Sequence, residues 1–316
     1  MKLLVIVIIL VSILLSIFCC NNENPNPDIY IPDINFLDAL CDAGYDTNND
    51  GYINTNEANA ITSIKIWDAN IYQLTGIENF INLDTLDVNN NIIHIMDLSK
   101  NTQLTYLDCS NNQLKEIDIS NNTALVWVDC GYNQLTALNL SKNTLLSNLE
   151  CGNNQLTELD ISNNVNLIRI RCSQNQINNL DLSNNTLLGV LACNNNRMTM
   201  LNVSLNTSLN YLFCRNNQIT NLDLSKNVDL FWISCSSNQI TTLNLSNNTR
   251  LMQLHCGNND LSSLDISNNR KLTWLEIANM PSLYDICVWE IPFPPYQNFV
   301  VESNGSSNYF FTIDCG

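Results

Sequence analysis

The sequence predicts a β-rich solenoid, a stack of short coils that all repeat one sequence pattern. Eight cysteines recur at every twenty-first position, from Cys109 to Cys256. A leucine column, Leu104 to Leu251, lies five residues before the cysteines, and an asparagine column, Asn112 to Asn259, lies three residues after them. A period of this length shared by apolar and turn-forming positions is typical of a repeat architecture.

Composition favours the same fold class. Asparagine accounts for 57 of the 316 residues, and it forms turns more readily than helices or strands. Long helices and a doubly wound sheet are therefore disfavoured. Hydrophobic residues still make up 45% of the chain, which is enough for a core. Each repeat offers about six apolar residues, too few for a core of its own, so neighbouring coils must stack.

The charge balance narrows the class of partner. The chain has 13 basic and 30 acidic residues, for a net charge of −17. This balance argues against nucleic acid and anionic membrane surfaces as partners. An excess of acidic residues is expected on a protein surface that faces water, or on one that binds a cation such as calcium.

Residues 1–20 read as a targeting segment. Lys2 precedes an uncharged apolar run from Leu3 to Phe18, as in a secretory signal peptide. The cysteines that end the run resemble the lipobox of bacterial lipoproteins, which implies lipidation of Cys20, with Cys19 as the other candidate. An uncleaved membrane anchor is the alternative reading. Residues 21–33, which contain prolines, are expected to form a flexible tether.

Residues 46–57, Asp-Thr-Asn-Asn-Asp-Gly-Tyr-Ile-Asn-Thr-Asn-Glu, match the EF-hand calcium loop. Calcium takes six to eight oxygen ligands, which explains oxygen-bearing residues at alternate positions. The expected ligands are the side chains of Asp46, Asn48 and Asp50, the Tyr52 carbonyl, Asn54 directly or through water, and both oxygens of Glu57. A simple Asp/Asn/Gly-rich turn is the alternative.

Apolar residues at helical spacing flank this loop and predict a helix on each side, within a calcium cap of residues 34–65. They are Phe36, Leu37 and Leu40 before the loop, and Ala58, Ile61 and Ile64 after it. EF-hands usually come in pairs, and a second loop is missing from the sequence. A structural clip is therefore expected rather than a calcium sensor.

Residues 66–280 carry the repeats, and each repeat is internally doubled. Leu-x-x-Leu-x-Cys-x-x-Asn is followed by Leu-x-x-Leu-Asp-Leu-Ser-x-Asn, so each repeat consists of two half-repeats of nearly equal length. The asparagines, including a second column from Asn101 to Asn269, are expected to turn inward and bond backbone groups that the turns leave unpaired. The stacked cysteines would lie about 4.8 Å apart, too far for disulfides, and are expected to be buried thiols.

Residues 281–316 break the repeat and are expected to form an irregular cap over the last coil. Cys287 and Cys315 lie in this segment, outside the cysteine column. A disulfide between them would staple the cap.

The repeat motif resembles bacterial leucine-rich repeats, and its nested form is similar to their IRREKO subclass. An EF-hand ahead of such repeats resembles internalin-like surface lipoproteins, over residues 34 to 316. The resemblance implies a leucine-rich-repeat fold on a bacterial outer membrane or cell surface, lipid-anchored or alternatively secreted. It supplies no catalytic residues and no partner.

Two variable columns, three residues and one residue before each cysteine, are expected to share the outer face of the strands. Aromatic rings in such a row are costly unless they bind something. Flat rings can bind a protein at a hot spot or stack on a neutral sugar. The alternative is that they only shield the sheet from solvent. The predicted ligand-binding residues are Tyr106, Trp127, Arg169, Arg171, Tyr211, Phe213, Trp232, His255 and Trp274.

These observations predict a monomeric, non-catalytic surface binding or adhesion protein that recognises a protein ligand. Capture of a neutral glycan by the tryptophan column is the alternative, and a purely structural envelope component stays open. An enzyme is disfavoured because His94 and His255 are the only histidines and lie on different half-repeats. No nucleophile–base pair or metal cluster stands out in the sequence.

Overall fold

The computed structural model describes residues 28–295 and 298–315 of the chain. The chain divides into two compact units, residues 1–124 (unit 1) and 125–316 (unit 2). The predicted signal peptide and its lipidation site at Cys20 lie outside the described residues.

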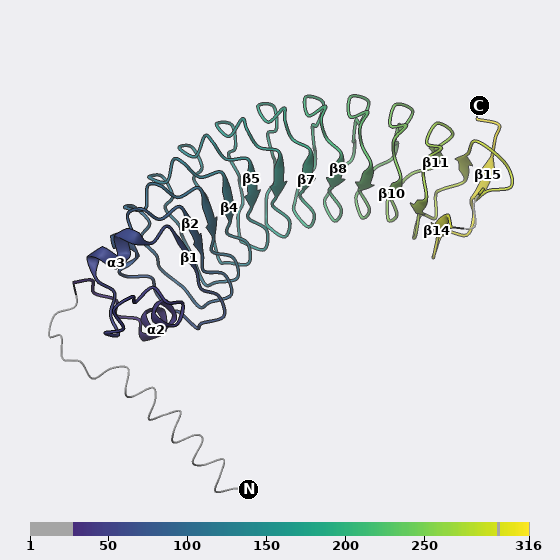
Figure 1. The fold of residues 1–316 in the computed structure, drawn as a ribbon. Helices are drawn as coiled ribbons and strands as arrows, with labels where there is room; N and C mark the ends of the chain where they lie inside the picture. Colours follow the sequence, from purple (N-terminus) through teal and green to yellow (C-terminus); the bar gives the residue numbers. More distant parts are fainter. Residues whose placement is uncertain (1–27, 296–297, 316) are drawn as a thin grey trace, which may run out of the picture. The chain divides into compact units, whose positions relative to one another are not determined.

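Unit 1 combines two short helices with the first coils of the solenoid. Its three strands pair in parallel, and Leu86 lies opposite Ile64 on one side and Leu107 on the other. The elements in chain order are α2 (Ile34–Asp42), α3 (Thr55–Ala60), β1 (Ser63–Lys65), the 3-10 helix η1 (Ile77–Asn79), β2 (Thr85–Asp87) and β3 (Tyr106–Asp108) (Figure 1).

Asp33 both starts α2 and fixes it to the first coil. One carboxylate oxygen accepts hydrogen bonds from the amides of Asn35 and Phe36, as an N-cap does. The other oxygen accepts from the amides of Tyr72 and Gln73, at 2.6 and 3.0 Å. Ile29 and Ile31 are also buried. The prediction of a tether over residues 21–33 is therefore wrong for residues 29–33, because Ile29, Ile31 and Asp33 are buried against the fold.

The second predicted helix is shorter than expected. α3 ends at Ala60, and Ile61 is already extended, with φ −84° and ψ 122°. Ile64 lies on β1, where it pairs with Leu86. The prediction that Ile61 and Ile64 continue a helix is wrong: both are β-branched residues, and they are buried in extended backbone, Ile61 after α3 and Ile64 on β1. The solenoid accordingly begins at residue 63, within the range predicted for the cap.

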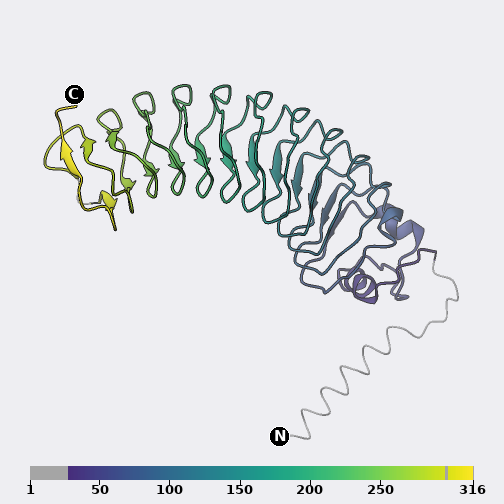
Figure 2. The ribbon, with the colours of Figure 1, turned by 180° about the vertical axis from the view of Figure 1, so that it is seen from behind.

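Unit 2 contains two parallel sheets, one on each half-repeat (Figures 1 and 2). In the first sheet each strand pairs with the equivalent strand of the next repeat, and β12 then pairs with β14 of the C-terminal segment. Its strands are β4 (Trp127–Asp129), β5 (Asn148–Glu150), β6 (Arg169–Arg171), β7 (Val190–Ala192), β8 (Tyr211–Phe213), β9 (Trp232–Ser234), β10 (Gln253–His255), β12 (Trp274–Glu276) and β14 (Val300–Glu302). The second sheet comprises β11 (Ser263–Asp265), β13 (Asp285–Cys287) and β15 (Phe310–Thr312).

The predicted solenoid is confirmed, and its core consists of stacked columns. Leu149, Cys151 and Leu156, for example, are fully buried, and the same positions are buried in the neighbouring coils. Since each apolar residue lies above its equivalent in the next coil, the interior is continuous within a unit. The ladder cysteines are buried throughout, as expected.

The first asparagine column bonds the backbone of two coils at once. The side-chain amide of Asn196 donates to the carbonyl oxygens of Cys172 and Cys193, both at 3.1 Å. Its oxygen accepts from the amide of Ile177 at 3.0 Å. The expected inward turn of these asparagines is therefore confirmed, and each one satisfies three buried backbone groups.

The turn after each strand requires a left-handed residue two positions after the cysteine. Asn153, Asn195, Asn216 and Asn258 occupy it with φ of 52–56°. Asparagine tolerates this conformation better than most non-glycine residues. This is a second reason for the asparagine content, beside the inward amides.

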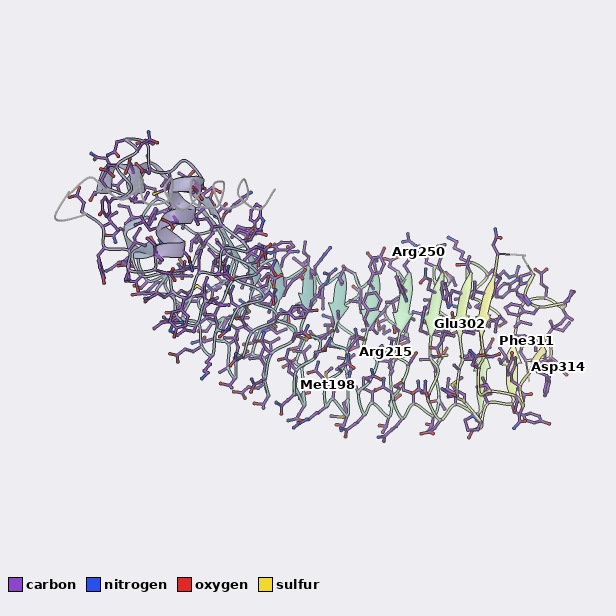
Figure 3. The ribbon with its side chains drawn as sticks, turned by 90° about the horizontal axis from the view of Figure 1, so that it is seen from below. Met198, Arg215, Arg250, Glu302, Phe311 and Asp314 are labelled. Carbon is purple, nitrogen blue, oxygen red and sulfur yellow. A yellow bond between two sulfur atoms is a disulfide. The ribbon has the colours of Figure 1, made fainter. Side chains whose placement is uncertain are left out.

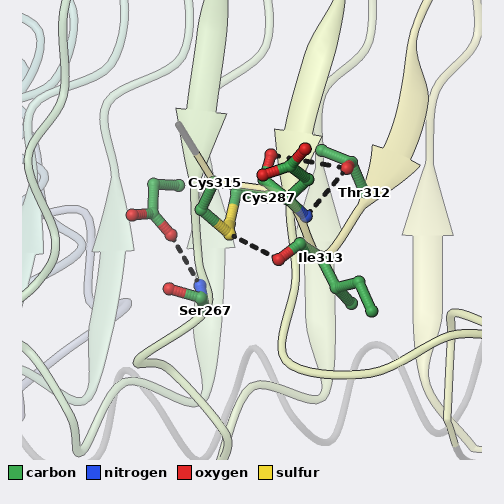
Figure 4. Close-up of a disulfide and its surroundings, with 7 residues drawn as sticks. Ser267, Cys287, Thr312, Ile313 and Cys315 are labelled. Atoms are coloured by element: carbon green, nitrogen blue, oxygen red, sulfur yellow. Dashed lines mark hydrogen bonds between the residues drawn. A yellow bond between two sulfur atoms is a disulfide. The ribbon is translucent and has the colours of Figure 1, made fainter.

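The C-terminal segment joins both sheets. β14 pairs with β12 and β15 pairs with β13, so strands as well as loops cover the last coil. A disulfide joins Cys287 on β13 to Cys315 (Figure 4). The two cysteines are 28 positions apart, and their bridge ties Cys315 to the second sheet.

Candidate functional site

The predicted calcium loop is held by its own side chains. Glu57 Oε1 accepts hydrogen bonds from the amide and hydroxyl of Thr47, both at 2.8 Å, and from the amide of Asn48. Glu57 Oε2 accepts from the amide of Asn54 at 3.0 Å. Burial opposes ionisation, but these hydrogen bonds outweigh it and lower the pKa of Glu57. The carboxylate therefore fastens the two ends of the loop.

The other loop acids point into the same turn. Asp46 accepts from the amides of Asp50 and Gly51, at 3.3 and 2.8 Å. Among the described residues, the His, Cys, Asp and Glu side chains that bring three ligand atoms within 4.8 Å of one another are Asp265, Cys287 and Cys315. Asp46, Asp50 and Glu57 do not converge to that extent, so calcium binding would require their oxygens to move together.

The predicted ligand face divides between the two units. Tyr106 lies on β3 of unit 1 and is half-buried. The other eight residues lie on unit 2, at the first and third positions of its strands. We call one surface of unit 2 the variable face. It consists of the first and third residues of β4–β10, β12 and β14, and of the residue two positions after each of these strands.

Five rings on the variable face, together with Phe231 just before β9, form a continuous aromatic row over β8 to β12. Phe213 meets Trp232 edge to face with ring centres 5.1 Å apart. His255 lies between Trp232 and Trp274, with ring centres 5.8 and 5.6 Å away. Such contacts stabilise the rings beyond their burial alone. The members of the aromatic row are Phe231, Tyr211, Phe213, Trp232, His255 and Trp274.

The aromatic row is less exposed than the sequence suggests. Trp127, Trp232 and Trp274 are half-buried, and so is His255. The prediction of an exposed tryptophan column is wrong in this respect, because rings from adjacent coils lean on one another. The ring nitrogens Nε1 of Trp232 and Trp274 and Nε2 of His255 are covered without a hydrogen-bond partner. Covered polar atoms of this kind cost stability unless a partner arrives.

The two arginines of the predicted face differ in their surroundings. Arg171 forms an ion pair with Glu150 of the preceding coil, at 3.3 Å, and remains exposed. Arg169 is half-buried at the start of the same strand. Since exposed ion pairs contribute little stability, Arg171 stays available to a partner.

A polar hollow of about 260 Å³ borders the aromatic row. Ser236 and Ala278 line it, and their small side chains leave it open. Glu276 lies at its edge: it accepts from the hydroxyl of Ser236 at 2.6 Å and from the amides of Gly257 and Ala278, at 3.3 and 3.2 Å. Its charged lining residues are Arg215, Glu276 and Glu302. Arg215 and Glu302 are labelled in Figure 3.

His255 lies between the hollow and the aromatic row. Burial lowers its pKa, and Arg215 acts in the same direction, while Glu276 and Glu302 oppose the shift. The imidazole is therefore neutral at pH 7 and stacks as a ring.

Sequence reasoning missed an exposed apolar edge on unit 2. Val126, Leu145, Ile168 and Leu187 are 41–53% exposed. Each lies directly beside a buried leucine of the core column, as in the Leu145–Leu146 pair. Such doublets were the available signal, since only one member can point inward. The hollow was missed too, because it follows from small residues on neighbouring coils.

Within the part of the chain that the structure describes, no helix combines the length and the apolar character needed to span a membrane.

Solved structures show what the chain is similar to. The functional domain of InlJ from Listeria monocytogenes, which includes a cysteine ladder, is 36% identical, with a TM-score of 0.81. The match covers 87% of this chain and 60% of the InlJ chain. The internalin InlF from Listeria monocytogenes is 21% identical with a TM-score of 0.68, over 92% of this chain and 99% of that one.

A plant receptor has the same fold. The peptide hormone receptor RGFR1, solved in complex with RGF2, is 22% identical, with a TM-score of 0.62. This match covers 82% of the present chain and 53% of the receptor chain. No protein-family model and no curated protein sequence matches the chain. The chain therefore has the leucine-rich-repeat fold, and it shares a cysteine ladder with the InlJ domain.

Proposed function

We propose that this protein is a non-catalytic surface binding protein whose variable face on unit 2 contacts a protein ligand. One observation carries the proposal: a continuous aromatic row lies beside a hollow with unpaired charges. Aromatic side chains surrounded by polar groups are characteristic of protein hot spots. The RGFR1 complex is consistent with it, since that receptor has the same fold and holds a peptide hormone.

The arrangement of the polar residues in the hollow supports a role in binding rather than catalysis. Ser236, His255 and Glu276 line one hollow, as the members of a hydrolytic triad would. However, the Ser236 hydroxyl donates to Glu276, and His255 Nε2 has no hydrogen-bond partner. A base that activates a serine must lie within hydrogen-bond reach of its hydroxyl. This set therefore lacks the contact that catalysis needs.

The protein acts as a monomer at the bacterial outer membrane or cell surface, lipid-anchored through Cys20 or alternatively secreted. The apolar run ending at Cys19 and Cys20 supports the anchor. The net charge of −17 suits a surface domain in water and disfavours nucleic acid.

Calcium stabilises the N-terminal part of the chain. The donor set fits this ion: Asp46, Asn48, Asp50 and Glu57 supply side-chain oxygens at EF-hand spacing on one loop. Asp46 and Glu57 are nearly buried and already bonded to loop amides, as groups that shape a metal loop would be.

The decisive test is binding of residues 21–316, in calcium, to a panel of surface proteins and neutral polysaccharides. Trp232→Ala with Trp274→Ala should abolish capture of a protein, whereas Trp67→Ala should not. Trp67 is the matched control because it is a tryptophan that is 53% exposed and belongs to unit 1, so it is not one of the residues of the variable face defined on unit 2. All variants must melt like wild type.

Each outcome has a definite meaning. Capture of a protein that survives loss of both tryptophans would refute the assigned face. Capture of an oligosaccharide instead would establish the glycan alternative. Absence of any bound protein across the panel would favour a structural envelope role. Size-exclusion chromatography of the same preparation tests the monomer.

A further inference from the structure

The hollow beside the aromatic row contains two carboxylates that face each other across adjacent strands. Glu276 on β12 lies directly opposite Glu302 on β14 in the register of the sheet. Like charges directly opposite in a sheet are destabilising. Both residues line the hollow, so their charges meet in the same space.

Two other acidic pairs in the chain show how such repulsion is relieved. Asp87 and Asp108 also lie opposite each other, and the side-chain amide of Asn89 donates to both. Glu150, opposite Asp129, forms an ion pair with Arg171.

Glu302 has no comparable relief. Within the described residues it is exposed and forms no ion pair, and neither does Arg215 at the other end of the hollow. Glu276 is bonded to neutral groups only. The hollow therefore has an uncompensated negative charge at its β14 end.

The dimensions favour an organic cation over a metal ion. His255, Glu276 and Glu302 do not bring their ligand atoms within 4.8 Å of one another, whereas a metal ion needs such convergence. The volume of about 260 Å³ also falls below the roughly 300–1,000 Å³ of typical small-molecule pockets. A space of this size is appropriate for one side chain of a larger partner.

The aromatic row supplies the second half of such a site. His255 lines the hollow together with the carboxylates. Trp274 stacks on His255 and shares a face of β12 with Glu276, two residues away, and Trp232 continues the row. Long basic side chains lay their apolar stems on aromatic surface while the charged end reaches an anion. The net charge of −17 attracts a basic partner at longer range.

We infer that the hollow receives an arginine or lysine side chain of the protein partner, with its charged end against Glu302 and Glu276 and its stem along Trp274 and His255. This inference rests on the proposed function and gives the chemistry of the partner at the same face. Arg215, at the far end, orients the partner by repelling a basic group there.

The test uses the full chain with ¹⁵N-labelled tryptophan and follows the indole N–H signals by NMR. The probes are N-acetyl-argininamide and its uncharged isostere N-acetyl-citrullinamide, up to about 50 mM because single side chains bind weakly. Of these two probes, the arginine probe should shift the Trp274 and Trp232 signals in a saturable way and the citrulline probe should not. N-acetyl-lysinamide should act like arginine, and N-acetyl-glutamine amide should not.

A matched pair of charge variants identifies the carboxylate. Glu302→Gln should weaken binding of the arginine probe by about fivefold, as expected for loss of one ion pair. Glu158→Gln removes the same charge from an exposed position on the second half-repeat and should leave binding unchanged. Both variants should melt within a degree or so of wild type, since both sites are exposed.

Several results would overturn the inference. They are equal shifts by the citrulline probe, no saturable shift by arginine or lysine, and an undiminished shift in Glu302→Gln. Equal shifts by calcium chloride alone would indicate a metal site instead. The two proposals can fail separately. If the basic probes do not bind but protein capture still depends on Trp232 and Trp274, the inference that the hollow receives a basic side chain is refuted and the proposed function stands.

Discussion

The carboxylate of Glu276 rests on the backbone of Gly257, whose amide donates to Glu276 Oε2 across 3.3 Å. A methyl group at residue 257 would collide with Glu276 Oε1 and with the carbonyl oxygen of Ala278. Because Gly257 has no side chain, the carboxylate of Glu276 can lie against the backbone of the neighbouring strand end and form the edge of the hollow.

Gly257→Ala should lower stability by about 1–3 kcal/mol, because the new methyl group displaces a bonded carboxylate and meets backbone. Gly189→Ala is the control, since a methyl group there would make only ordinary contacts. Thermal unfolding by circular dichroism measures both. Equal melting temperatures for the two variants would contradict the close contact between Glu276 and Gly257.

Asn196→Ala should destabilise unit 2 by about 3 kcal/mol or more. The substitution leaves the amide of Ile177 buried without a partner. It also removes one of the two side-chain amides that donate to each of the carbonyls of Cys172 and Cys193, which then keep only Asn175 and Asn217. Asn221→Ala, at an exposed position, should change stability by less than about 0.5 kcal/mol. Urea unfolding midpoints compare the two, and a similar loss in both would show that the inward amide is dispensable.

The ladder thiols should be inert in the folded protein. Burial raises the pKa of Cys172 to about 12, and that of Cys235 likewise to about 12, so almost no thiolate exists at pH 8. Labelling with a disulfide reagent should therefore leave the eight ladder cysteines unmodified until urea unfolds the chain. Mass spectrometry of labelled peptides identifies the sites, and rapid native modification of Cys172 or Cys235 would contradict their burial.

The periodic part of the fold could be predicted from the sequence because each repeated position has the same neighbours. Leu149, Cys151 and Asn154 occupy the places that their columns predict. The prediction failed where the period changes. Ile64 pairs with Leu86 although it lies one position earlier than the repeat period would place it. It therefore falls outside the columns, and its spacing from Ala58 and Ile61 predicts a helix instead.

The site was only partly predictable for a different reason. The columns identify Trp232, His255 and Trp274 as outward residues, but their exposure depends on rings one coil away along the diagonal. The hollow depends on small side chains among its lining residues, namely those of Ser236 and Ala278. The alternation of side chains along a strand predicts which face each side chain lies on. It does not predict how much space the side chains of neighbouring coils leave around it.

His255 should titrate below the ordinary value of about 6.5, because burial disfavours the charged ring. Between its folded pKa and 6.5, the unfolded chain binds more protons than the folded one. The free energy of unfolding due to His255 therefore rises with pH across this window, and is lost as the pH falls through it.

Proton NMR titration of the ring, assigned with His94→Gln, measures the midpoint of His255. The His255→Gln variant should lose less stability than wild type when the pH drops from about 7 to about 5.5. A midpoint at or above 6.5 would show that the two glutamates outweigh burial.

Calcium should raise the melting temperature of the chain, because ordering the loop of residues 46–57 around an ion stabilises the part that holds α2 and α3. At a calcium concentration 100 times the Kd, mass action predicts about 2.7 kcal/mol. Asp50→Asn is the sharpest variant: it removes one carboxylate charge and keeps an oxygen that can accept from the Tyr52 amide, as Asp50 does at 3.0 Å.

The calcium-dependent rise should therefore shrink in Asp50→Asn, while melting in EGTA stays close to wild type. Glu57→Gln would be less informative, because Glu57 also accepts from Thr47 and Asn54 and its loss weakens the loop without any ion. Calorimetry with calcium chloride measures binding directly. Identical melting of wild type in calcium and in EGTA, with no heat of binding, would mean that the loop acids serve only to bond their own backbone.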